Sequence, residues 1–219
     1  MLSITRHTSL NDINIPFGIV EVHYPEPNQW CQADFRSLVQ QELTDCRQRF
    51  ATYERKAVFG ENPYVRFFKR FRKTYPVLLQ FESIILKGQP FPEQNLIAEV
   101  PFLMELTTHV LSGAHDADQL CGTVELYLAA EKEPFIGLHE RELHTYPGDF
   151  CARDESGIIF SQIAGTDART AARPDSCHVF YPIFGTPDLP RTVIDDAVNV
   201  LSGYIQILAP EAQIESAFV

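Results

Sequence analysis

The stretch of the sequence with the most potential chemistry is a short polar turn between two apolar segments. Gly113 and Ala114 end a segment rich in Leu, Ile and Phe, and His115 and Asp116 follow directly. A histidine beside a carboxylate could serve as a base, so His115 is the candidate catalytic residue. Alternatively, Asp116 and Asp118 could hydrogen-bond the amides of their own turn, which is a structural role. If this elbow borders a cleft, Gly113, Ala114, His115 and Asp116 are expected ligand contacts.

A second polar segment follows an apolar strand candidate in the last third of the chain. Gln162, Thr166 and Arg169 lie there among small residues. A loop with hydroxyl groups and backbone amides near an arginine could bind a carboxylate or a phosphate, or it could be an ordinary exposed loop. We expect the cleft to be bounded by this loop, and Arg169 to be the partner of the anion.

Possible metal ligands are densest between His139 and His144. On a strand these two histidines point to opposite faces, and on a helix they lie about 140° apart. Neither arrangement converges on one ion, so we predict no metal site there and no cofactor. The glycine spacings of dinucleotide-binding loops, P-loops and nucleophile elbows do not occur, which disfavours nucleotide-dependent and serine-hydrolase chemistry.

Positive charge is concentrated in one segment of an acidic chain. The net charge of −11 opposes a general electrostatic hold on nucleic acid, because that hold depends on Lys and Arg. Of the 18 Lys and Arg residues, five fall between positions 66 and 73. We predict that Arg66, Lys69, Arg70 and Lys73 form an RNA-contacting surface; the alternative is the solvated face of an amphipathic helix.

Apolar periodicity predicts the elements that position these residues. A strand is expected at 15–24 and helices at 34–53, from Asn62-Pro63 onward, at 77–87 and at 95–111, where Pro101 should kink or divide the helix. Strands cluster between residues 121 and 184, before a final helix that ends near Leu208. Helices before and after a block of strands favour an α+β fold. We divide the chain into an N-terminal extension, residues 1–59, with a strand and a long amphipathic helix packed on the main domain, residues 60–219.

Cysteine usage and the length of apolar runs indicate the cellular compartment of the protein. The five cysteines are odd in number and widely spaced, with no Cys-x-x-Cys pair. This usage is typical of a reduced, cytoplasmic protein. No apolar run reaches the length of about 18 residues that a membrane span needs, so we predict no membrane partner. The sequence leaves the oligomeric state open.

Several weak motifs, in this order and spacing, resemble the B3/B4 domain family. They are Gly113-Ala114-x-Asp116-x-Asp118-x-Leu120-x-Gly122, Glu133-x-Phe135, Gly137-Leu138 and Gly148-Asp149-x-x-x-x-Asp154. The family includes a domain of the β subunit of bacterial phenylalanyl-tRNA synthetase and also stand-alone proteins. The resemblance covers roughly residues 60 to 208 and implies a three-layer α+β domain with a β-sandwich core flanked by helices.

The resemblance also implies a pocket. In the synthetase, the B3/B4 domain hydrolyses tyrosine wrongly attached to the phenylalanine tRNA. By alignment, its pocket threonine falls at Pro101, its pocket histidine at Gly113, and the glutamate that reads the tyrosine hydroxyl near Tyr181. Because these groups are missing here, we expect an amino acid or aminoacyl end to be bound more readily than cleaved. Glu99 and Tyr181 complete the expected ligand contacts.

Three functions remain open from the sequence. The first is a synthetase-related domain, without the synthetase's catalytic core, that binds tRNA or an aminoacyl or amino-acid group. The second is a free-standing editing hydrolase for mischarged aminoacyl-tRNA, with His115, Glu99, Thr166 and Arg169 as candidate residues. The third is a small-molecule or protein-interaction domain that no longer binds RNA. Whether the protein is an enzyme is also left open.

Overall fold

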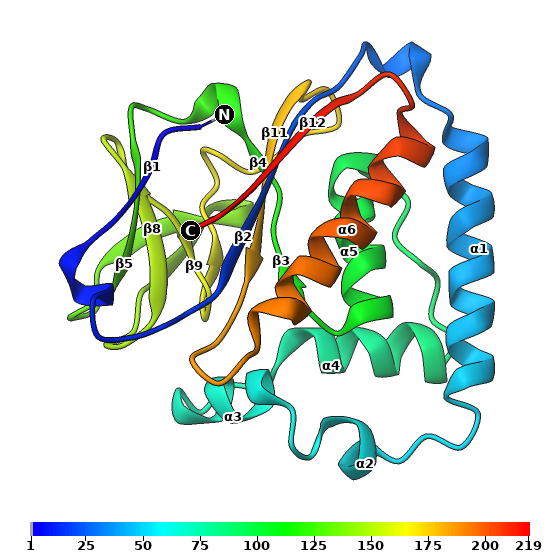
Figure 1. Ribbon diagram of the computed structural model, residues 1–219, viewed down its shortest axis with the longest axis horizontal. Helices are drawn as coiled ribbons and strands as arrows, with labels where there is room; N and C mark the ends of the chain where they lie inside the picture. Colours follow the sequence, from blue (N-terminus) through cyan, green and yellow to red (C-terminus); the bar gives the residue numbers. More distant parts are fainter. Residues whose placement is uncertain (1) are drawn as a thin grey trace.

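Two β-sheets face each other in the computed structural model, which describes residues 2–219 (Figure 1). The first sheet has the strand order β1 (Ile4–Arg6), β5 (Val124–Leu128), β8 (Phe150–Asp154), β9 (Gly157–Ser161) and β10 (Gly165–Thr166). The second has the order β12 (Gln213–Phe218), β2 (Phe17–His23), β11 (His178–Phe184) and β3 (Leu111–Ser112), with β4 (His115–Asp116) also paired to β11. A separate hairpin joins β6 (Pro134–Gly137) and β7 (Arg141–His144).

The helices form a third layer on the outer side of the second sheet (Figure 1). They are α1 (Gln32–Arg49), α2 (Arg55–Phe59), α3 (Pro63–Arg70), α4 (Pro76–Phe81), which continues into the π-helical turn η3 (Glu82–Leu86), α5 (Leu96–Thr108) and α6 (Arg191–Leu208). Short 3₁₀ turns complete the elements: η1 (Thr8–Leu10), η2 (Pro27–Gln29), η4 (Ala117–Gln119) and η5 (Leu138–Glu140). In the part of the chain that the structure describes, no helix is long and apolar enough to cross a bilayer.

Aromatic side chains fill the space between the two sheets. The Phe17 ring of β2 lies edge-on to the Phe150 ring of β8, with centroids 5.4 Å apart, and Phe160 of β9 meets Phe184 of β11 at 4.9 Å. Edge-to-face pairs of this kind add roughly 0.5–1.5 kcal/mol each beyond the apolar area that they bury. The predicted α+β fold with a β-sandwich core is confirmed, and its helix layer lies beside the second sheet.

Helix ends follow the predicted capping residues. The Asn62 side chain accepts hydrogen bonds from the amides of Tyr64 (2.9 Å) and Val65 (3.3 Å), and Pro63 occupies the first turn of α3, where no N–H is needed. Gly88 follows η3 with a φ of +67°, the left-handed conformation that glycine adopts readily at such ends.

Helix α5 runs through Pro101 as one helix, so of the two predicted effects of this proline, a kink or a division, the division is wrong. A proline lacks the N–H that would bond the carbonyl four residues earlier, here that of Ile97. The hydroxyl of Tyr181 donates to the Ile97 carbonyl at 3.2 Å, and Tyr181 in turn lies 2.7 Å from the Tyr24 hydroxyl. Strand β11 therefore supplies, through Tyr181, the partner that the helix loses.

The N-terminal segment contributes one strand to each sheet. β1 pairs in parallel with β5, and β2 lies between β12 and β11 in the second sheet. β2 is buried along almost its whole length, from Phe17 to Val22. The division at residue 59 stays a prediction, but the strand before it is an interior part of the sandwich and not an added layer.

Candidate functional site

A cavity of about 440 Å³ lies between α5 and the elbow that follows it. Three parts of the chain form most of its wall: α5 with Ala98, Pro101 and Phe102, the elbow at residues 112–114, and the later loop with Thr166 and residues 171–172. Most of these side chains are apolar or small. The cavity therefore has the size and lining of a site for a small ligand.

Glu105 of α5 is the one acidic side chain lining this cavity among the described residues. Its Oε1 accepts hydrogen bonds from the Ser112 amide at 2.8 Å and from the Ser112 hydroxyl at 3.0 Å. Burial raises the pKa of Glu105 to about 8, because its desolvation outweighs the two bonds from Ser112, which lower the pKa. At neutral pH the carboxyl group is mostly protonated and can donate a hydrogen bond.

Gln80 gives the cavity a second polar group. Its Oε1 is buried and has no hydrogen-bond partner among the described residues, and the residue lines the cavity beside Glu105. A buried polar atom without a partner costs roughly 1–3 kcal/mol. A ligand that donates a hydrogen bond to Gln80 would remove this cost.

Two further cavities continue from the first. One of about 280 Å³ shares Leu111, Ser112 and Thr166 with it and reaches Gln162 and Lys73. The other, of about 310 Å³, also includes Lys73 and extends to Lys132 and His144. We call these three adjoining cavities the groove: it runs from an apolar end at Glu105 to a basic end at Lys73.

Four of the predicted ligand contacts line the groove. Gly113 and Ala114 border the cavity at Glu105, Thr166 lies where two cavities meet, and Gln162 lies in the middle section. The elbow and the loop at 162–169 therefore come together as predicted from the sequence. That these residues contact a ligand stays a prediction.

His115 does not line the groove, contrary to the sequence expectation. Its side chain is fully buried between the sheets, and its ring lies 5.8 Å from those of Phe160 and Phe180. Nδ1 lies 2.8 Å from the Thr170 hydroxyl, which also hydrogen-bonds Asp167. Burial lowers the pKa of His115 to about 3, so the ring is neutral and a poor base. A buried His115–Thr170–Asp167 chain replaces the predicted catalytic histidine.

The two aspartates of the elbow differ in role. Asp116 is buried, and its carboxylate accepts from the Asp118 amide at 3.1 Å and from the Ser176 hydroxyl at 2.8 Å. This is the predicted turn-stabilising role, which takes Asp116 out of the predicted ligand contacts. The Asp118 carboxylate lies instead 3.0 Å from Nδ1 of His178.

Arg169 is already paired with carboxylates of its own chain, so it is not the anion partner that the sequence suggested. One guanidinium nitrogen lies 2.8 Å from Asp154 Oδ1, another donates to the Gln119 carbonyl at 2.5 Å, and a third lies 3.8 Å from Asp167. The residue borders a depression beside the β6–β7 hairpin and not the groove. A ligand anion would have to compete with Asp154 for it.

Glu99 and Tyr181 are also structural. Glu99 is buried and joins Arg36 of α1 at 2.5 Å while accepting from the Asn95 amide at 3.0 Å. Tyr181 is fully buried and completes the hydrogen bonding of α5 through Ile97. Neither residue lines the groove, which corrects both expectations.

The predicted basic surface is divided between α3 and the turn after it. α3 ends at Arg70, so Lys73 lies beyond the helix, where its ammonium group is 5.5 Å from the centroid of the Tyr146 ring. Arg66 lies 3.3 Å from Glu61 and 3.8 Å from Asp188, while Lys69 and Arg70 are exposed. Lys73 is the member of this set that lines the groove. RNA contact by any of them stays a prediction.

Sequence comparisons connect part of this chain to one enzyme subunit. Over 99 residues, 45% of the chain, it is 35% identical to the phenylalanine–tRNA ligase β subunit of Mycoplasma genitalium. Over 45 residues, 20% of the chain, it is 44% identical to the corresponding subunit of Mycoplasma pneumoniae. These matches span 12% and 6% of the two relatives, so the chain corresponds to a small part of each. No protein-family model matches the sequence.

A solved structure shows the same fold. It is an N-terminal fragment of the phenylalanyl-tRNA synthetase β subunit from Pyrococcus horikoshii, and it superposes with a TM-score of 0.51. The similarity covers 100% of this chain and 54% of that fragment, at 12% sequence identity. The predicted resemblance to a B3/B4-like domain is thereby confirmed: this chain is similar in sequence to part of the phenylalanyl-tRNA synthetase β subunit, and it has the fold seen in the N-terminal region of such a subunit.

Proposed function

We propose that this domain binds the aminoacyl end of a tRNA in the groove, with the amino-acid group in the cavity at Glu105 and phosphates at the Lys73 end. The observation that carries the proposal is the continuity of the groove: an apolar cavity with a protonated carboxyl group leads directly to lysine side chains. The sequence similarity to a tRNA ligase subunit supports the same substrate class.

The cavity at Glu105 suits the amino-acid part. Phe102, Leu111 and Leu138 supply apolar surface for a side chain, and Glu105 and Gln80 supply polar atoms. A protonated Glu105 can donate to the ester carbonyl, and Gln80 Oε1 can accept from the amino group. These two contacts would fix the orientation of the aminoacyl group.

The basic end suits the tRNA backbone. Lys73 and Lys132 are both exposed and border the same cavity, which is also lined by His144 and Glu142, 3.5 Å apart. An ammonium group binds phosphate as a point charge, and two such contacts predict a log–log salt dependence of about −1.4, from about −0.7 per phosphate on a single strand. The net charge of −11 requires that RNA contact stay local in this way.

Binding without rapid cleavage fits the lining of the cavity. Pro101 and Gly113 stand where the resembling editing pocket has its threonine and histidine, and His115 is sealed between the sheets. The alternative, an editing hydrolase, is favoured by one observation: Glu105, with a pKa of about 8, can exchange a proton near neutral pH. The cellular setting that we propose is the reduced cytoplasm, in keeping with five free cysteines.

The test compares binding of phenylalanyl-tRNA, tyrosyl-tRNA and uncharged tRNA to the purified chain. We expect charged tRNA to bind more tightly than uncharged tRNA. Ala98→Trp should remove this preference, since residue 98 is exposed at the cavity and a large ring there would fill it. Lys73→Glu and Lys132→Glu should weaken both forms of tRNA alike, whereas the charge-matched control Lys87→Glu, outside the groove, should not.

Other outcomes would replace the proposal. Hydrolysis of the aminoacyl ester that disappears in Glu105→Gln would identify an editing hydrolase. Binding of a free amino acid with no tRNA binding at low salt would identify a small-molecule domain. Equal binding of charged and uncharged tRNA by wild type and Ala98→Trp would show that the cavity does not receive the aminoacyl group.

A further inference from the structure

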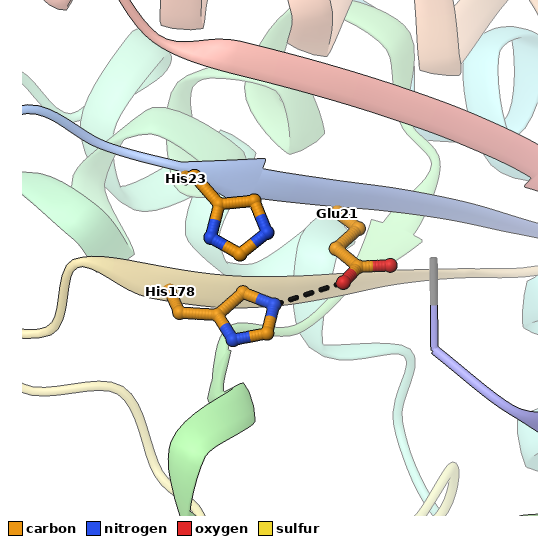
Figure 2. A group of neighbouring side chains, drawn as sticks. All are labelled: Glu21, His23 and His178. Carbon is orange, nitrogen blue, oxygen red and sulfur yellow. Dashed lines mark hydrogen bonds and ion pairs between the residues drawn. The ribbon is translucent and has the colours of Figure 1, made fainter.

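The pairing of β2 with β11 brings together three metal-ligating side chains from distant parts of the sequence. His23 and His178 are opposite each other in the antiparallel register, and Glu21 lies two residues before His23, so all three project from the same face (Figure 2). One ligand atom from each of these residues lies within 4.8 Å of those of the other two. This spacing brings two imidazoles and one carboxylate around a common point.

His178 is held as metal-binding histidines usually are. Its Nε2 faces Glu21 Oε1 at 2.8 Å (Figure 2). Its Nδ1 lies 3.0 Å from the carboxylate of Asp118. A carboxylate on the second ring nitrogen fixes the tautomer and makes the first nitrogen a better ligand. Asp118 comes from η4, so a third element supports the cluster.

We infer that Glu21, His23 and His178 form a binding site for one divalent transition-metal ion, with Zn²⁺ as the ion that best fits the ligand set. Two histidines and one carboxylate are a known zinc-binding combination that leaves a fourth coordination position for water. The site is distinct from the groove, since none of its three ligands lines any of the groove's cavities.

An ion can reach this cluster from the solvent on the side of its two histidines. Glu21 is buried and anchored by the Leu2 amide at 2.6 Å, whereas His178 is partly exposed and His23 is exposed. The two imidazole rings are stacked, with centroids 4.0 Å apart and planes inclined by 18°. Coordination by both requires one ring to leave the stack, and the exposed His23 ring can turn about its broad χ2 torsion. Glu21 and His178 are therefore the fixed ligands, and His23 closes the site.

A bound ion would join β2 directly to β11 at the end of their shared register. Without an ion, a protonated His178 could form only an ion pair, placed between Glu21 and Asp118. The two states differ in the role of His23: the ion pair does not need it, and the metal site does. This difference decides the design of the test.

The experiment titrates Zn²⁺, and Co²⁺ as its spectroscopic substitute, into the full chain after treatment with EDTA and in the presence of a phosphine reductant. We expect one ion per chain, visible Co²⁺ absorption of a tetrahedral site, and a rise in Tm of about 5 °C or more at a hundredfold excess of Zn²⁺ over Kd. His23→Ala should lose this binding while keeping the metal-free Tm, because its side chain is exposed. Asp118→Asn should weaken it about 10-fold to 100-fold, as loss of a supporting carboxylate does.

Matched controls exclude other ligands. Cys177→Ser tests the thiol next to His178, and His144→Ala tests an exposed histidine that lies 3.5 Å from Glu142; both should bind the ion as wild type does. Binding that persists in both His23→Ala and His178→Ala would overturn the site. So would a metal-free chain that binds neither ion at concentrations of about 1 mM, which would leave only the ion pair.

Discussion

The elbow has polar groups on two sides: one side faces the groove, and the other faces the core between the sheets. Glu105 and Ser112 face the groove, while His115, three residues after Ser112, is enclosed between the sheets. Gly113 lies between these two environments, and there is little space around it: a Cβ atom there would lie 3.6 Å from His115 Nε2. Chemistry at this elbow therefore belongs to the groove side, and the histidine that looks catalytic in the sequence belongs to the core.

This comparison makes a general prediction: changes on the sandwich side should alter stability, and changes on the groove side should alter binding.

The largest effect is expected from removing residues 1–57. The deletion takes β2 out of the middle of the second sheet and leaves the facing edges of β11 and β12 without their hydrogen-bonded partner. We expect an aggregated product, measured by size-exclusion chromatography. A monomeric, cooperatively unfolding fragment would show that residues 60–219 fold alone.

His115→Ala tests the sandwich side directly. The change removes a fully buried ring and the hydrogen bond between that ring and the Thr170 hydroxyl, while Thr170 keeps its bond to Asp167. We expect the free energy of unfolding to fall by about 3 kcal/mol, combining a cavity with the lost hydrogen bond. Denaturant unfolding measures this loss, and tRNA binding by the folded fraction should stay within about twofold of wild type. A stable variant that has lost binding would place His115 in the site after all.

Glu105 provides a pH test of the groove side. Its folded-state pKa of about 8 exceeds the ordinary value of 4.5, so the folded protein holds a proton that the unfolded chain releases. The contribution of Glu105 to stability should therefore fall as pH rises, by about 1.5 kcal/mol between pH 6.5 and pH 8. Glu105→Gln should flatten this slope in chemical denaturation measured at several pH values.

The comparison with Glu105→Gln isolates Glu105 from two buried histidines. Burial lowers the pKa of His109 to about 4 and that of His115 to about 3, so each adds stability as pH rises through the ordinary value of 6.5, by roughly 0.4 kcal/mol between pH 6.5 and pH 8. This opposing change is the same in wild type and in Glu105→Gln, so it leaves their difference unaltered. An unchanged slope in Glu105→Gln would show that the carboxyl group is ionised in the folded protein. The proposed hydrogen bond from Glu105 to an ester carbonyl would then fail as well.

The smallest effect is expected at Gly113, which separates the groove from the core between the sheets. In Gly113→Ala the added Cβ would lie 3.2 Å from Pro182 Cγ, closer than ordinary contact. We expect a loss of stability of about 1 kcal/mol, typical of slight overpacking, and a modest loss of affinity for charged tRNA. The matched variant Ala114→Gly adds no atom, so we expect the packing at the elbow to stay unchanged. Equal binding by both variants and wild type would mean that the ligand does not touch the elbow.

Local features of the fold could be predicted from the sequence because their causes are local. Asn62 followed by Pro63 is a capping signal, and Asn95 caps α5 in the same way by accepting from the Ile97 amide at 3.1 Å. The convergence of the elbow with the loop at 162–169 followed from the family resemblance. These predictions needed only neighbouring residues or a recognised order of motifs.

The orientation of side chains could not be predicted in the same way. His115 reaches the core because β4 pairs with β11 in a register that places it opposite Phe180, and no short-range signal fixes that register. Glu105 had a detectable signal, a lone acidic residue in the apolar second half of α5. The Glu21, His23 and His178 cluster had none, since His178 lies more than 150 residues after the other two and only sheet pairing brings it to them.

The hydrogen bond from Tyr181 to the Ile97 carbonyl has a consequence for how this chain can vary. Pro101 removes one partner of that carbonyl, and the phenol of a distant strand replaces it. Tyr181→Phe alone would leave this buried carbonyl without a partner, whereas Pro101→Ala restores the amide, so that of its two partners only Tyr24 still needs the phenol. The two positions form an epistatic pair, so sequences descended from this one should lose the tyrosine only after they have lost the proline.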